Sequence, residues 1–509
     1  MRKAWVILIA VLAVAQQNGY RKIPVETLRD KIAGGWAGQM IGVSFGAPTE
    51  FRSNGKINDA ELPKWTPERV SNSLGQDDLY VDMTFAAVLD EKGLDATSDD
   101  FGAMFRDAKY SLWHANLAAR RALKRGIPGS QSGLPQYNAH ANDIDFQIES
   151  DFIGLMAPGL FQSSNDIAAR AGRVMNYGDG IYGGMFVSGM YAAAFFETDP
   201  RKVVEAGLAC IPRKSPYGML VADLLAWSKQ YPGDWRKAWQ LIEDKWDKND
   251  PCPDGALKPF NIDAKLNGAY IALGLLYGGR DFGKTIEIAT RAGQDSDCNP
   301  ASAGGILGVL LGYQAIPNEW KGGIPALADK KFSYTDFSFN TIVESTVKRA
   351  LALIRRTGGQ VEGDTALVKA QTPKAPKLEV WNYGTVSERI AAADPRWSWK
   401  GDWRTDARRP SRTASGKGAE ASVSFTGTGA IVTGPYFTEG GKADVYLDGK
   451  LSRTVDVCSD ERNGRTGEAV WHAFGLKNGS HTVRLVVRGE PYGSYQGTDV
   501  GIDDVVVFR

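Results

Sequence analysis

The spacing of apolar residues changes once along this chain, near Thr357, and this change constrains the fold more than any other feature. From about Ile23 to Arg356, apolar residues recur at the spacing of helices that bury one face, as in residues 341–354. Beyond Thr357, short runs alternate between apolar and polar residues and are separated by turn sequences such as Asp448-Gly449. The sequence therefore predicts a mostly helical domain followed by a β-domain. Length agrees, because 509 residues exceed the roughly 300 residues at which a single core stops growing.

The predicted boundaries follow this change. The helical domain covers residues 20–358, a linker bearing Lys and Pro covers 359–378, and a β-sandwich of jelly-roll type covers 379–509. The sandwich is predicted from five short strands: Ala421–Phe425, Ala430–Thr433, Ala443–Leu447, His481–Val487 and Gly501–Phe508.

The N-terminus has the pattern of a signal peptide. Two basic residues precede the 12-residue apolar run Ala4–Ala15, which ends in the small-residue sequence Ala13-Val14-Ala15. A membrane anchor is the alternative, but a span needs about 20 apolar residues. We therefore expect residues 1–15 to be removed and the protein to be secreted or periplasmic, with no integral membrane span left after cleavage.

The overall charge excludes one class of partner. The chain has 60 Lys and Arg against 59 Asp and Glu, so it offers no long-range attraction for nucleic acid. No nucleic-acid partner is expected, and no pattern in the sequence predicts an oligomeric state.

Four cysteines, Cys210, Cys252, Cys298 and Cys458, are too few for a disulfide framework. A pairing of Cys210 with Cys252 is possible, although sequence alone does not fix connectivity. The absence of C-x-x-C spacing argues against a zinc site. His114 and His140 also have no partner at metal-ligand spacing, although an acidic segment next to His140 makes that residue a candidate for a cleft.

Glycine and alanine are frequent on the apolar faces of the predicted helices, as in residues 301–311 (ASAGGILGVLL). Glycine inside a helix costs about 1 kcal/mol relative to alanine. We therefore expect neighbouring helix backbones to approach closely at these positions.

Two acidic motifs each precede a predicted helix. Asp77 and Asp78 come just before the run 81–89, and Asp295 and Asp297 come just before 301–311. Neighbouring carboxylates repel one another unless a cation lies between them, and hard divalent cations take oxygen ligands. The alternative is that each aspartate only caps its helix, since Asp is a favoured cap residue.

These motifs belong to a wider pattern. The run Ile32–Phe51 (IAGGWAGQMIGVSFGAPTEF) resembles the opening helix and loop of the ADP-ribosylglycohydrolase family. Gln76-Asp77-Asp78 resembles the family's Thr/Ser-Asp-Asp motif, and residues 292–308 (AGQDSDCNPASAGGILG) resemble its closing motif. The three stretches occur in the family's order, and the likeness covers about residues 23–356.

The resemblance implies an all-α orthogonal bundle with a binuclear Mg²⁺ or Mn²⁺ centre in a central cleft. By position, the metal ligands would be Asp77, Asp78, Asp295 and Asp297, and Glu50 would match the family's cleft glutamate. Family enzymes cleave the bond at the anomeric carbon of ribose. In such a site, the cations would orient the sugar hydroxyls and polarise a water while a carboxylate serves as acid or base.

Two positions depart from the family pattern. Gln76 replaces Thr or Ser, although its carbonyl oxygen can still ligate or contact substrate. Cys298 replaces Thr and is a poorer ligand for hard metals. The expected cofactor is therefore one or two divalent ions, with Mg²⁺ favoured over Mn²⁺ or Ca²⁺.

Further candidates come from the middle of the domain. Glycosidases use two carboxyl groups, one as acid and one as base or nucleophile, and Glu149 and Asp151 are candidates for that pair, with Glu50 a third. The alternative is a solvated acidic loop. The glycine-rich run 177–184 carries Tyr177, Asp179 and Tyr182, which suit a sugar ring, although the run can equally be a turn. Asn299, beside the second acidic motif, completes the predicted substrate contacts.

The β-domain resembles the galactose-binding-like jelly rolls found in many secreted glycan-active enzymes. The resemblance rests on residues 423–429, 445–449 and 479–483. Trp397, Trp399 and Trp403 cluster near the start of this domain and are either a sugar platform or core packing.

Three functions are compatible with this sequence. The first is a secreted, metal-dependent glycosidase that cleaves a furanosidic bond in a glycan. The second is an ADP-ribosyl hydrolase acting on a modified protein or small molecule. The third is a non-catalytic glycan-binding protein, suggested by the substitutions at Gln76 and Cys298.

Overall fold

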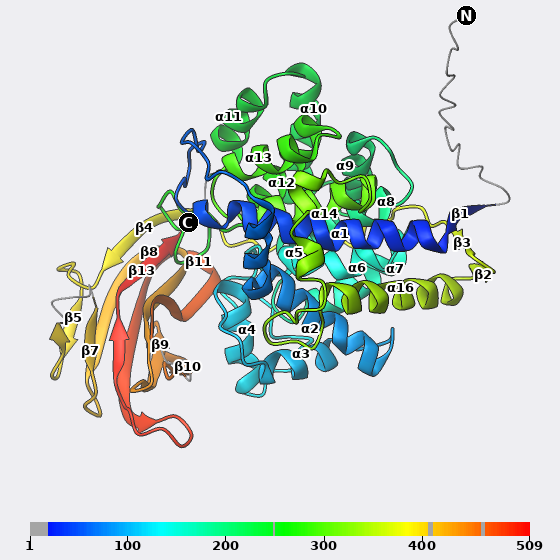
Figure 1. The fold of residues 1–509 in the computed structure, drawn as a ribbon. Coiled ribbons are helices and arrows are strands. Elements are labelled where there is room, and N and C mark those ends of the chain that lie inside the picture. Colours follow the sequence, from blue (N-terminus) through cyan, green and yellow to red (C-terminus); the bar gives the residue numbers. More distant parts are fainter. Residues whose placement is uncertain (1–18, 248–249, 406–410, 460–463) are drawn as a thin grey trace, which may run out of the picture.

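The computed structural model describes residues 19–247, 250–405, 411–459 and 464–509. The predicted signal peptide, residues 1–15, lies outside these ranges. Among the helices described, none is both long and apolar enough to cross a membrane. Figure 1 shows two parts, a large helical domain and a smaller β-domain beside it.

The helical domain confirms the predicted all-α architecture. Its helices are α1 (Val25–Gly46), α2 (Asp77–Lys92), α3 (Ser98–Asp107), α4 (His114–Lys124), α5 (Asp145–Ile148), α6 (Asp151–Leu155), α7 (Phe161–Gly172), α8 (Asp179–Ala194), α9 (Pro200–Ala209), α10 (Pro216–Gln230), α11 (Trp235–Trp246), α12 (Ala264–Gly278), α13 (Phe282–Arg291), α14 (Cys298–Leu311), α15 (Asn318–Lys321) and α16 (Phe339–Arg356). The helices α8, α12 and α14 are buried along almost their whole length, so the domain is built around a helical core.

Helices α1 and α14 run antiparallel and nearly touch, as their glycines predict. A Cβ atom placed on Gly38 would lie 2.1 Å from the Gly304 carbonyl oxygen, and one on Gly42 would lie 2.0 Å from the Pro300 carbonyl oxygen. Either distance is a steric clash, so only glycine permits this approach. The close contact places the end of α1 against the start of α14.

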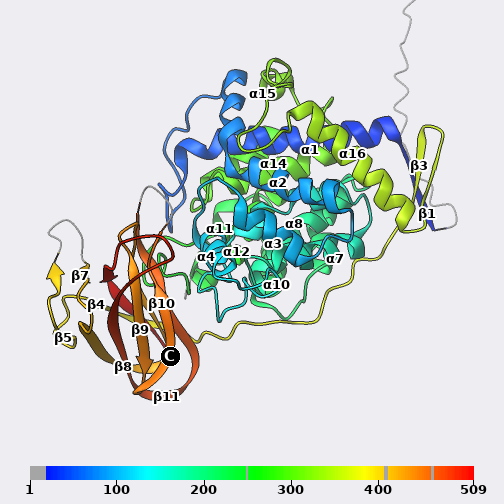
Figure 2. The same ribbon diagram turned by 90° about the horizontal axis from the view of Figure 1, so that it is seen from below.

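Part of the predicted linker has regular structure. Residues 360–369 form a hairpin of β2 (Gln360–Glu362) and β3 (Thr365–Lys369), and β3 pairs with β1 (Tyr20–Pro24) near the N-terminus. The sheet order is β1-β3-β2. Residues 370–385 contain no helix or strand and run along the outside of the helical domain, as Figure 2 shows.

The β-domain is antiparallel throughout its strand ladders. Its strands are β4 (Val386–Ala391), β5 (Ser398–Lys400), β6 (Arg404–Thr405), β7 (Arg412–Ala414), β8 (Glu420–Tyr436), β9 (Gly441–Leu447), β10 (Lys450–Asp456), β11 (Arg465–Pro491), β12 (Val500–Ile502) and β13 (Asp504–Phe508). One sheet has the order β10-β9-β11-β8-β13-β4 and another has β12-β7-β6. The two strands predicted at 421–425 and 430–433 are one continuous strand, β8, because its long partner β11 pairs with both halves.

The tryptophans at the start of this domain pack together. The Trp397 and Trp399 rings stack at 5.0 Å, and Trp403 meets Trp399 edge-on at 4.8 Å. Trp397 is buried in the β-domain core, and the other two pack against that core. Of the two predicted roles, core packing is the one that the arrangement supports.

Polar contacts join the two domains along α4. Arg121 donates to Glu468 at 2.7 Å, and Arg125 forms an ion pair with Asp456. The ring of His472 contacts the Pro135 carbonyl oxygen at 2.7 Å. The β-domain therefore docks on the side of the helical domain that carries α4, as Figure 1 shows.

The possible disulfide between Cys210 and Cys252 is not formed. Both residues are buried free thiols. Cys210 packs against Gly189 of α8, where its sulfur lies 2.8 Å from the place of an added Cβ, whereas Cys252 contacts His140. The two sulfurs have different neighbours because their segments pack on different parts of the helical domain.

Candidate functional site

A cavity of about 620 Å³ opens at the starts of α2, α4 and α14. This volume is in the usual range for small-ligand sites, roughly 300–1,000 Å³. Acidic residues make up much of its lining: Glu50, Asp77, Asp145, Asp254, Asp295 and Asp297. Gln76, His114, Asn116 and Cys298 also line it, together with apolar and aromatic side chains.

The first acidic motif forms the opening turn of α2. Gln76 occupies the N-cap position but its side chain makes no capping hydrogen bond, and Asp77 and Asp78 follow inside the helix. Asp77 lines the cavity, while Asp78 is buried behind it. The capping alternative therefore does not explain this pair.

The second motif is held by a strained turn. Gln294 has φ of +53°, a left-handed conformation that is costly for a residue other than glycine. Its backbone carbonyl accepts from the Phe51 N–H at 3.0 Å, and its side chain clamps the chain near Asn261 by accepting from that residue's N–H at 2.8 Å. Asp297 stands at the N-cap of α14 without a capping hydrogen bond, so its carboxylate is also available to a ligand.

The glycine contact between α1 and α14 continues into the site. A Cβ on Gly46 would lie 2.0 Å from the Ser296 carbonyl oxygen, and the Thr49 and Ser296 hydroxyls are 2.8 Å apart. This contact sets Glu50, which follows α1, beside the second acidic motif. Sequence-distant carboxylates thus meet because two helices approach at glycine.

Three of the four predicted ligands, Asp78, Asp295 and Asp297, fall in two overlapping groups, and the fourth, Asp77, belongs to neither. Glu50, Asp295 and Asp297 can bring one oxygen each to within 4.8 Å of one another, and so can Asp78, Asp297 and Cys298 with its sulfur. Asp297 belongs to both groups. The buried Oδ1 atoms of Asp78 and Asp295 have no hydrogen-bond partner. Buried carboxylate oxygens without donors are suited to a hard cation, so these residues fit the divalent metal that the resemblance implies.

The clustering of carboxyl groups raises their pKa values. Loss of hydration, followed by repulsion from Asp297, raises the pKa of Asp77 to about 6. Burial and neighbouring carboxylates raise the pKa of Asp78 and of Asp295 well above the usual range. Glu50 is exposed as a residue, yet its carboxyl lies in the cavity, where loss of hydration and then Asp297 and Asp77 raise its pKa to about 8. Without a cation, these groups compete for protons.

Glu149 and Asp151 are buried, which contradicts the alternative of a solvated acidic loop. Glu149 accepts a hydrogen bond from the amide of Asn116, which itself lines the cavity. Both oxygens of Asp151 lack a hydrogen-bond partner, and burial raises its pKa to about 7. Neither residue is part of the cavity lining, so their catalytic role stays a prediction.

The remaining predicted substrate contacts lie elsewhere. The Tyr182 hydroxyl donates to the Lys377 carbonyl oxygen and accepts from the Glu379 N–H, so the extended segment after β3 covers it. Asp179 accepts from the Tyr217 N–H, and the Tyr177 ring lies under Arg173. Asn299 is buried and its amide donates to Asn267 at 3.0 Å. None of these four is among the residues lining the cavity.

Sequence reasoning missed the aromatic wall. Phe51 and Phe260 have ring centroids 5.0 Å apart, and Tyr80 and Trp113 also line the cavity. Trp113 is 43% exposed and its ring lies 4.6 Å from the guanidinium of Arg465, so the β-domain supports this wall. Phe51 is the last residue of the first family-like run and Tyr80 follows the first acidic motif, but Trp113 and Phe260 come from segments with no motif.

Known proteins resemble parts of this chain. A profile of the ADP-ribosylglycohydrolase family matches residues 24–360. A curated protein described as A type blood alpha-D-galactosamine galactosaminidase, from Flavonifractor plautii, is 30% identical over 110 residues, which are 20% of this chain and 10% of that protein. The chain thus spans about a tenth of the length of this relative.

Among solved structures, an ADP-ribosylglycohydrolase-related protein complex aligns with a TM-score of 0.41 and 17% identity, covering 64% of this chain and 98% of the other. A family 35 carbohydrate binding module from an environmental isolate aligns with a TM-score of 0.18 and 14% identity, covering 23% of this chain and 90% of the module.

Proposed function

This chain belongs to the ADP-ribosylglycohydrolase family of hydrolases, and from that premise we propose that it is a metal-dependent glycosidase that cleaves a furanosidic bond in a glycan. The family assignment covers the helical domain, which contains the whole acidic cluster. The proposal adds the class of substrate and the roles of individual residues.

The observation that carries the proposal is the charge of the cavity. Six acidic residues line it, and none of the described lining residues is Lys or Arg. A diphosphate such as that of ADP-ribose carries negative charge and is normally bound by cationic side chains or backbone N–H groups. A neutral sugar avoids this repulsion, and its ring can pack on aromatic side chains such as Phe260 and Trp113.

The four aspartates of the two motifs would hold the cation, with Glu50 beside it and free to carry a proton. A bound divalent cation would supply positive charge that orients sugar hydroxyls and stabilises negative charge developing on oxygen. Asp297 contributes to both ligand groups, so the arrangement accommodates one or two ions.

Glu50 is the carboxyl best placed to move a proton. It is the exposed member of the acidic cluster, and loss of hydration, the largest cause of its raised pKa, favours the protonated form. Protonation of the leaving oxygen by a carboxylic acid is a required step in most glycosidases. We assign that role to Glu50, while the neighbouring aspartates bind and orient the substrate through the cation.

Two further features support a glycan substrate. The N-terminal pattern predicts export, and glycans are abundant outside the cytoplasm. The curated relative is named for action on a galactosamine-bearing blood-group glycan. The β-domain fits this setting as a module that steadies the cavity wall through Arg465.

The experiment is a screen of nitrophenyl glycosides, furanosides and galactosaminides included, with Mg²⁺ and with EDTA. Mg²⁺-dependent turnover that is lost in Asp77→Ala and Asp295→Ala supports the proposal. ADP-ribose is titrated by calorimetry in parallel. Tight ADP-ribose binding with release of ADP-ribose from modified proteins, and no glycoside turnover, would overturn it in favour of an ADP-ribosyl hydrolase. Glycan binding without any turnover would instead identify a binding protein.

A further inference from the structure

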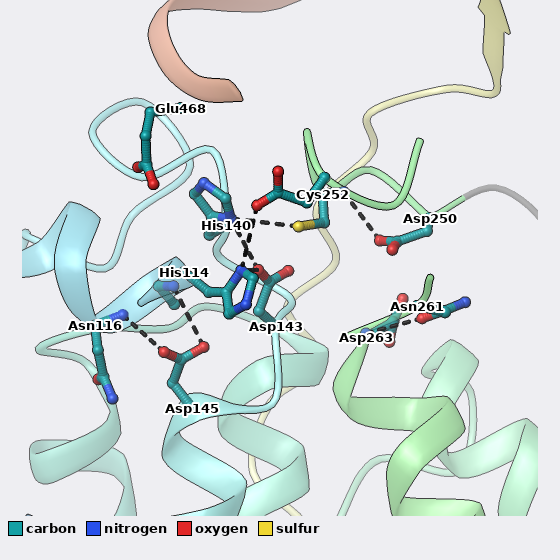
Figure 3. A network of polar contacts seen from close by, with 12 residues as sticks. His114, Asn116, His140, Asp143, Asp145, Asp250, Cys252, Asn261, Asp263 and Glu468 are labelled. Atoms are coloured by element: carbon teal, nitrogen blue, oxygen red, sulfur yellow. Dashed lines mark hydrogen bonds and ion pairs between the residues drawn. The ribbon is translucent and has the colours of Figure 1, made fainter. Parts of the chain in front are cut away.

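A second cluster of ligand-type side chains lies beside the cavity, apart from the acidic motifs. His114 is the first residue of α4, His140 and Asp143 come from the segment before α5, and Cys252 comes from the segment before α12. Figure 3 shows the two imidazole rings, the carboxylate of Asp143 and the thiol of Cys252 turned toward one another. One nitrogen from each histidine, one oxygen and the sulfur all lie within 4.8 Å of one another.

The spacing of these atoms is close to that of a tetrahedral site. Zinc bonds of about 2.0–2.1 Å to nitrogen or oxygen and about 2.3 Å to sulfur place neighbouring ligand atoms about 3.3–3.6 Å apart. The His140 Nδ1 atom is 2.9 Å from Asp143 Oδ2 and 3.5 Å from the Cys252 sulfur. The His114 Nδ1 atom is 3.9 Å from Asp143 Oδ2. These three pairs depart from tetrahedral spacing by about 0.6 Å or less, and the remaining pairs lie within 4.8 Å.

Hydrogen bonding among these residues does not satisfy them. The Nδ1 atom of His140 faces both Asp143 and Cys252, yet a single N–H can serve only one of them. The buried His114 Nδ1 and Asp143 Oδ1 atoms have no hydrogen-bond partner. Asp143 and Cys252 are fully buried, so these atoms are also withheld from water. An unsatisfied buried nitrogen costs about 1–3 kcal/mol, and a cation bound by His114 Nδ1 would remove that cost.

The backbone at His114 is also unusual. Its φ is +45°, in the left-handed region, which costs roughly 1–3 kcal/mol for a residue with a side chain. This conformation starts α4 and turns the imidazole toward His140, whose ring centroid is 5.8 Å away. A bound ligand would explain why the strain is retained.

The donor set selects the metal. Two imidazole nitrogens, one carboxylate oxygen and one thiolate sulfur are the ligand types of zinc sites, whereas Mg²⁺ prefers oxygen alone. One carboxylate and one thiolate would also balance the two positive charges of Zn²⁺ inside the protein. Four protein ligands leave no open position, which is typical of a structural site.

We propose that His114, His140, Asp143 and Cys252 form a structural Zn²⁺ site, separate from the acidic centre. The His114 ring stacks on Phe260 at 5.7 Å, and both residues line the cavity. The ion ties the start of α4 to the segments before α5 and α12. It therefore fixes one wall of the cavity, and it does so whichever substrate the acidic centre acts on.

The test uses the full-length protein carrying Asp297→Asn, which removes the carboxylate shared by both acidic ligand groups and so weakens their competition for metal. Elemental analysis after dialysis against Zn²⁺ should find about one zinc per chain. With Co²⁺ in place of Zn²⁺, a thiolate-to-cobalt charge-transfer band should appear. This band should disappear in Cys252→Ser and remain in Cys210→Ser, another buried free thiol, and in Cys298→Ser.

Two results would overturn the proposal. The first is a protein that binds less than about one Zn²⁺ or Co²⁺ ion per chain. The second is a charge-transfer band that is lost with Cys298→Ser and kept with Cys252→Ser. If Cys252→Ser does not fold, zinc X-ray absorption of the parent protein decides. One sulfur with three nitrogen or oxygen neighbours supports the site, and a shell without sulfur excludes it.

Discussion

The acidic centre and the histidine–cysteine cluster are both buried, both border one cavity, and yet differ in how the chain builds them. The acidic centre takes its ligands from the first turn of α2 and from the residues leading into α14, in motifs of two to four consecutive residues. The other cluster takes four residues from three segments that span positions 114 to 252, with His140 and Asp143 from the same segment. The first centre offers oxygen donors with one sulfur at its edge, and the second mixes nitrogen, oxygen and sulfur.

This difference teaches which kinds of site can be predicted from sequence. A helix start imposes local geometry, so adjacent aspartates there are informative even without a structure. Ligands that are scattered along the chain meet only through tertiary packing, and their separation in sequence forms no recognisable motif. The two clusters should accordingly respond to different metals and to different mutations, and the following experiments test that separation.

The largest expected effect is on the acidic centre. Asp297→Asn removes the carboxylate shared by both ligand groups while keeping its shape. Loss of a metal's electrostatic contribution, worth several kcal/mol, should lower kcat/KM on the order of a thousand-fold. The zinc content of the other cluster should not change. Asp336→Asn, at an exposed ion pair, is the matched control and should keep full activity. Full activity in Asp297→Asn would exclude the centre as the site of chemistry.

Chelation should separate the two clusters without mutation. EDTA should abolish activity, and added Mg²⁺ should restore it because oxygen ligands suit Mg²⁺. Mg²⁺ should not restore the thermal stability lost with zinc, since a ligand present at a hundred times its Kd contributes about 2.7 kcal/mol to the folded state. Activity assays and thermal unfolding on the same samples measure both. If Mg²⁺ alone recovers stability in full, the two clusters are not independent.

A substitution between helices should affect one cluster only. Gly42→Ala places a Cβ 2.0 Å from the Pro300 carbonyl oxygen and must push α1 away from α14. We expect a loss of about 1–3 kcal/mol in the free energy of unfolding and weaker Mg²⁺ binding, with the zinc content retained. Gly233→Ala, where an added Cβ meets nothing within 4 Å, is the control for the substitution itself. Denaturant titration and Mg²⁺ calorimetry provide the two readouts.

The sulfur at the edge of the acidic centre offers a smaller effect. Cys298 donates to Asp78 at 3.4 Å, in a position where the family has threonine. Cys298→Thr replaces a soft donor with a hard one, so affinity for Mg²⁺ should rise about several-fold relative to Zn²⁺. Competition between the two ions, followed by calorimetry, measures this change. An unchanged ratio would show that the thiol only packs there.

The change from helices to strands near Thr357 and the meeting of the two acidic motifs could be predicted from the sequence. Apolar periodicity and helix starts are local properties of the sequence. The three family-like runs gave further support because they occur in the family's order. The close approach of α1 and α14 at glycines could also be expected, although not the residues that pair. Glycine destabilises a helix, so its frequent use on apolar helix faces indicates close packing.

Other features depend on packing over long distances. The hairpin at 360–369 forms because β1, more than 300 residues earlier, supplies its partner strand. The aromatic wall and the partners of His114 come from segments that no motif connects. For the same reason, absent C-x-x-C spacing was a weak argument against zinc, since it addresses only sites built from consecutive turns. The glycine-rich run at 177–184 was predicted to contact a sugar ring. In the structure, the extended segment after β3 covers Tyr182, so this residue does not line the cavity.

The smallest effect concerns an ion pair of the β-domain that belongs to neither cluster, and it gives the pH baseline for both. His481 contacts Asp448 at 2.7 Å, which raises the pKa of the imidazole and lowers that of the carboxyl. Because the pKa of His481 is raised in the folded protein, the histidine stabilises the fold below about pH 6.5. This stabilisation is lost as pH rises through the pKa of the folded state. Because the pKa of Asp448 is lowered in the folded protein, the aspartate stabilises the fold above about pH 3.9. This stabilisation is lost as pH falls through the pKa of the folded state.

The pair is therefore most stabilising between about pH 4 and 6.5. Because it is near the surface, Asp448→Asn should cost about 1 kcal/mol or less at pH 5.5 and less again at pH 8. Denaturant titration at the two pH values measures this, with metal content unchanged at both. A larger loss at pH 8 than at pH 5.5 would contradict the assignment of the ion pair. Any steeper pH dependence of metal binding or activity then belongs to the two clusters and not to the fold as a whole.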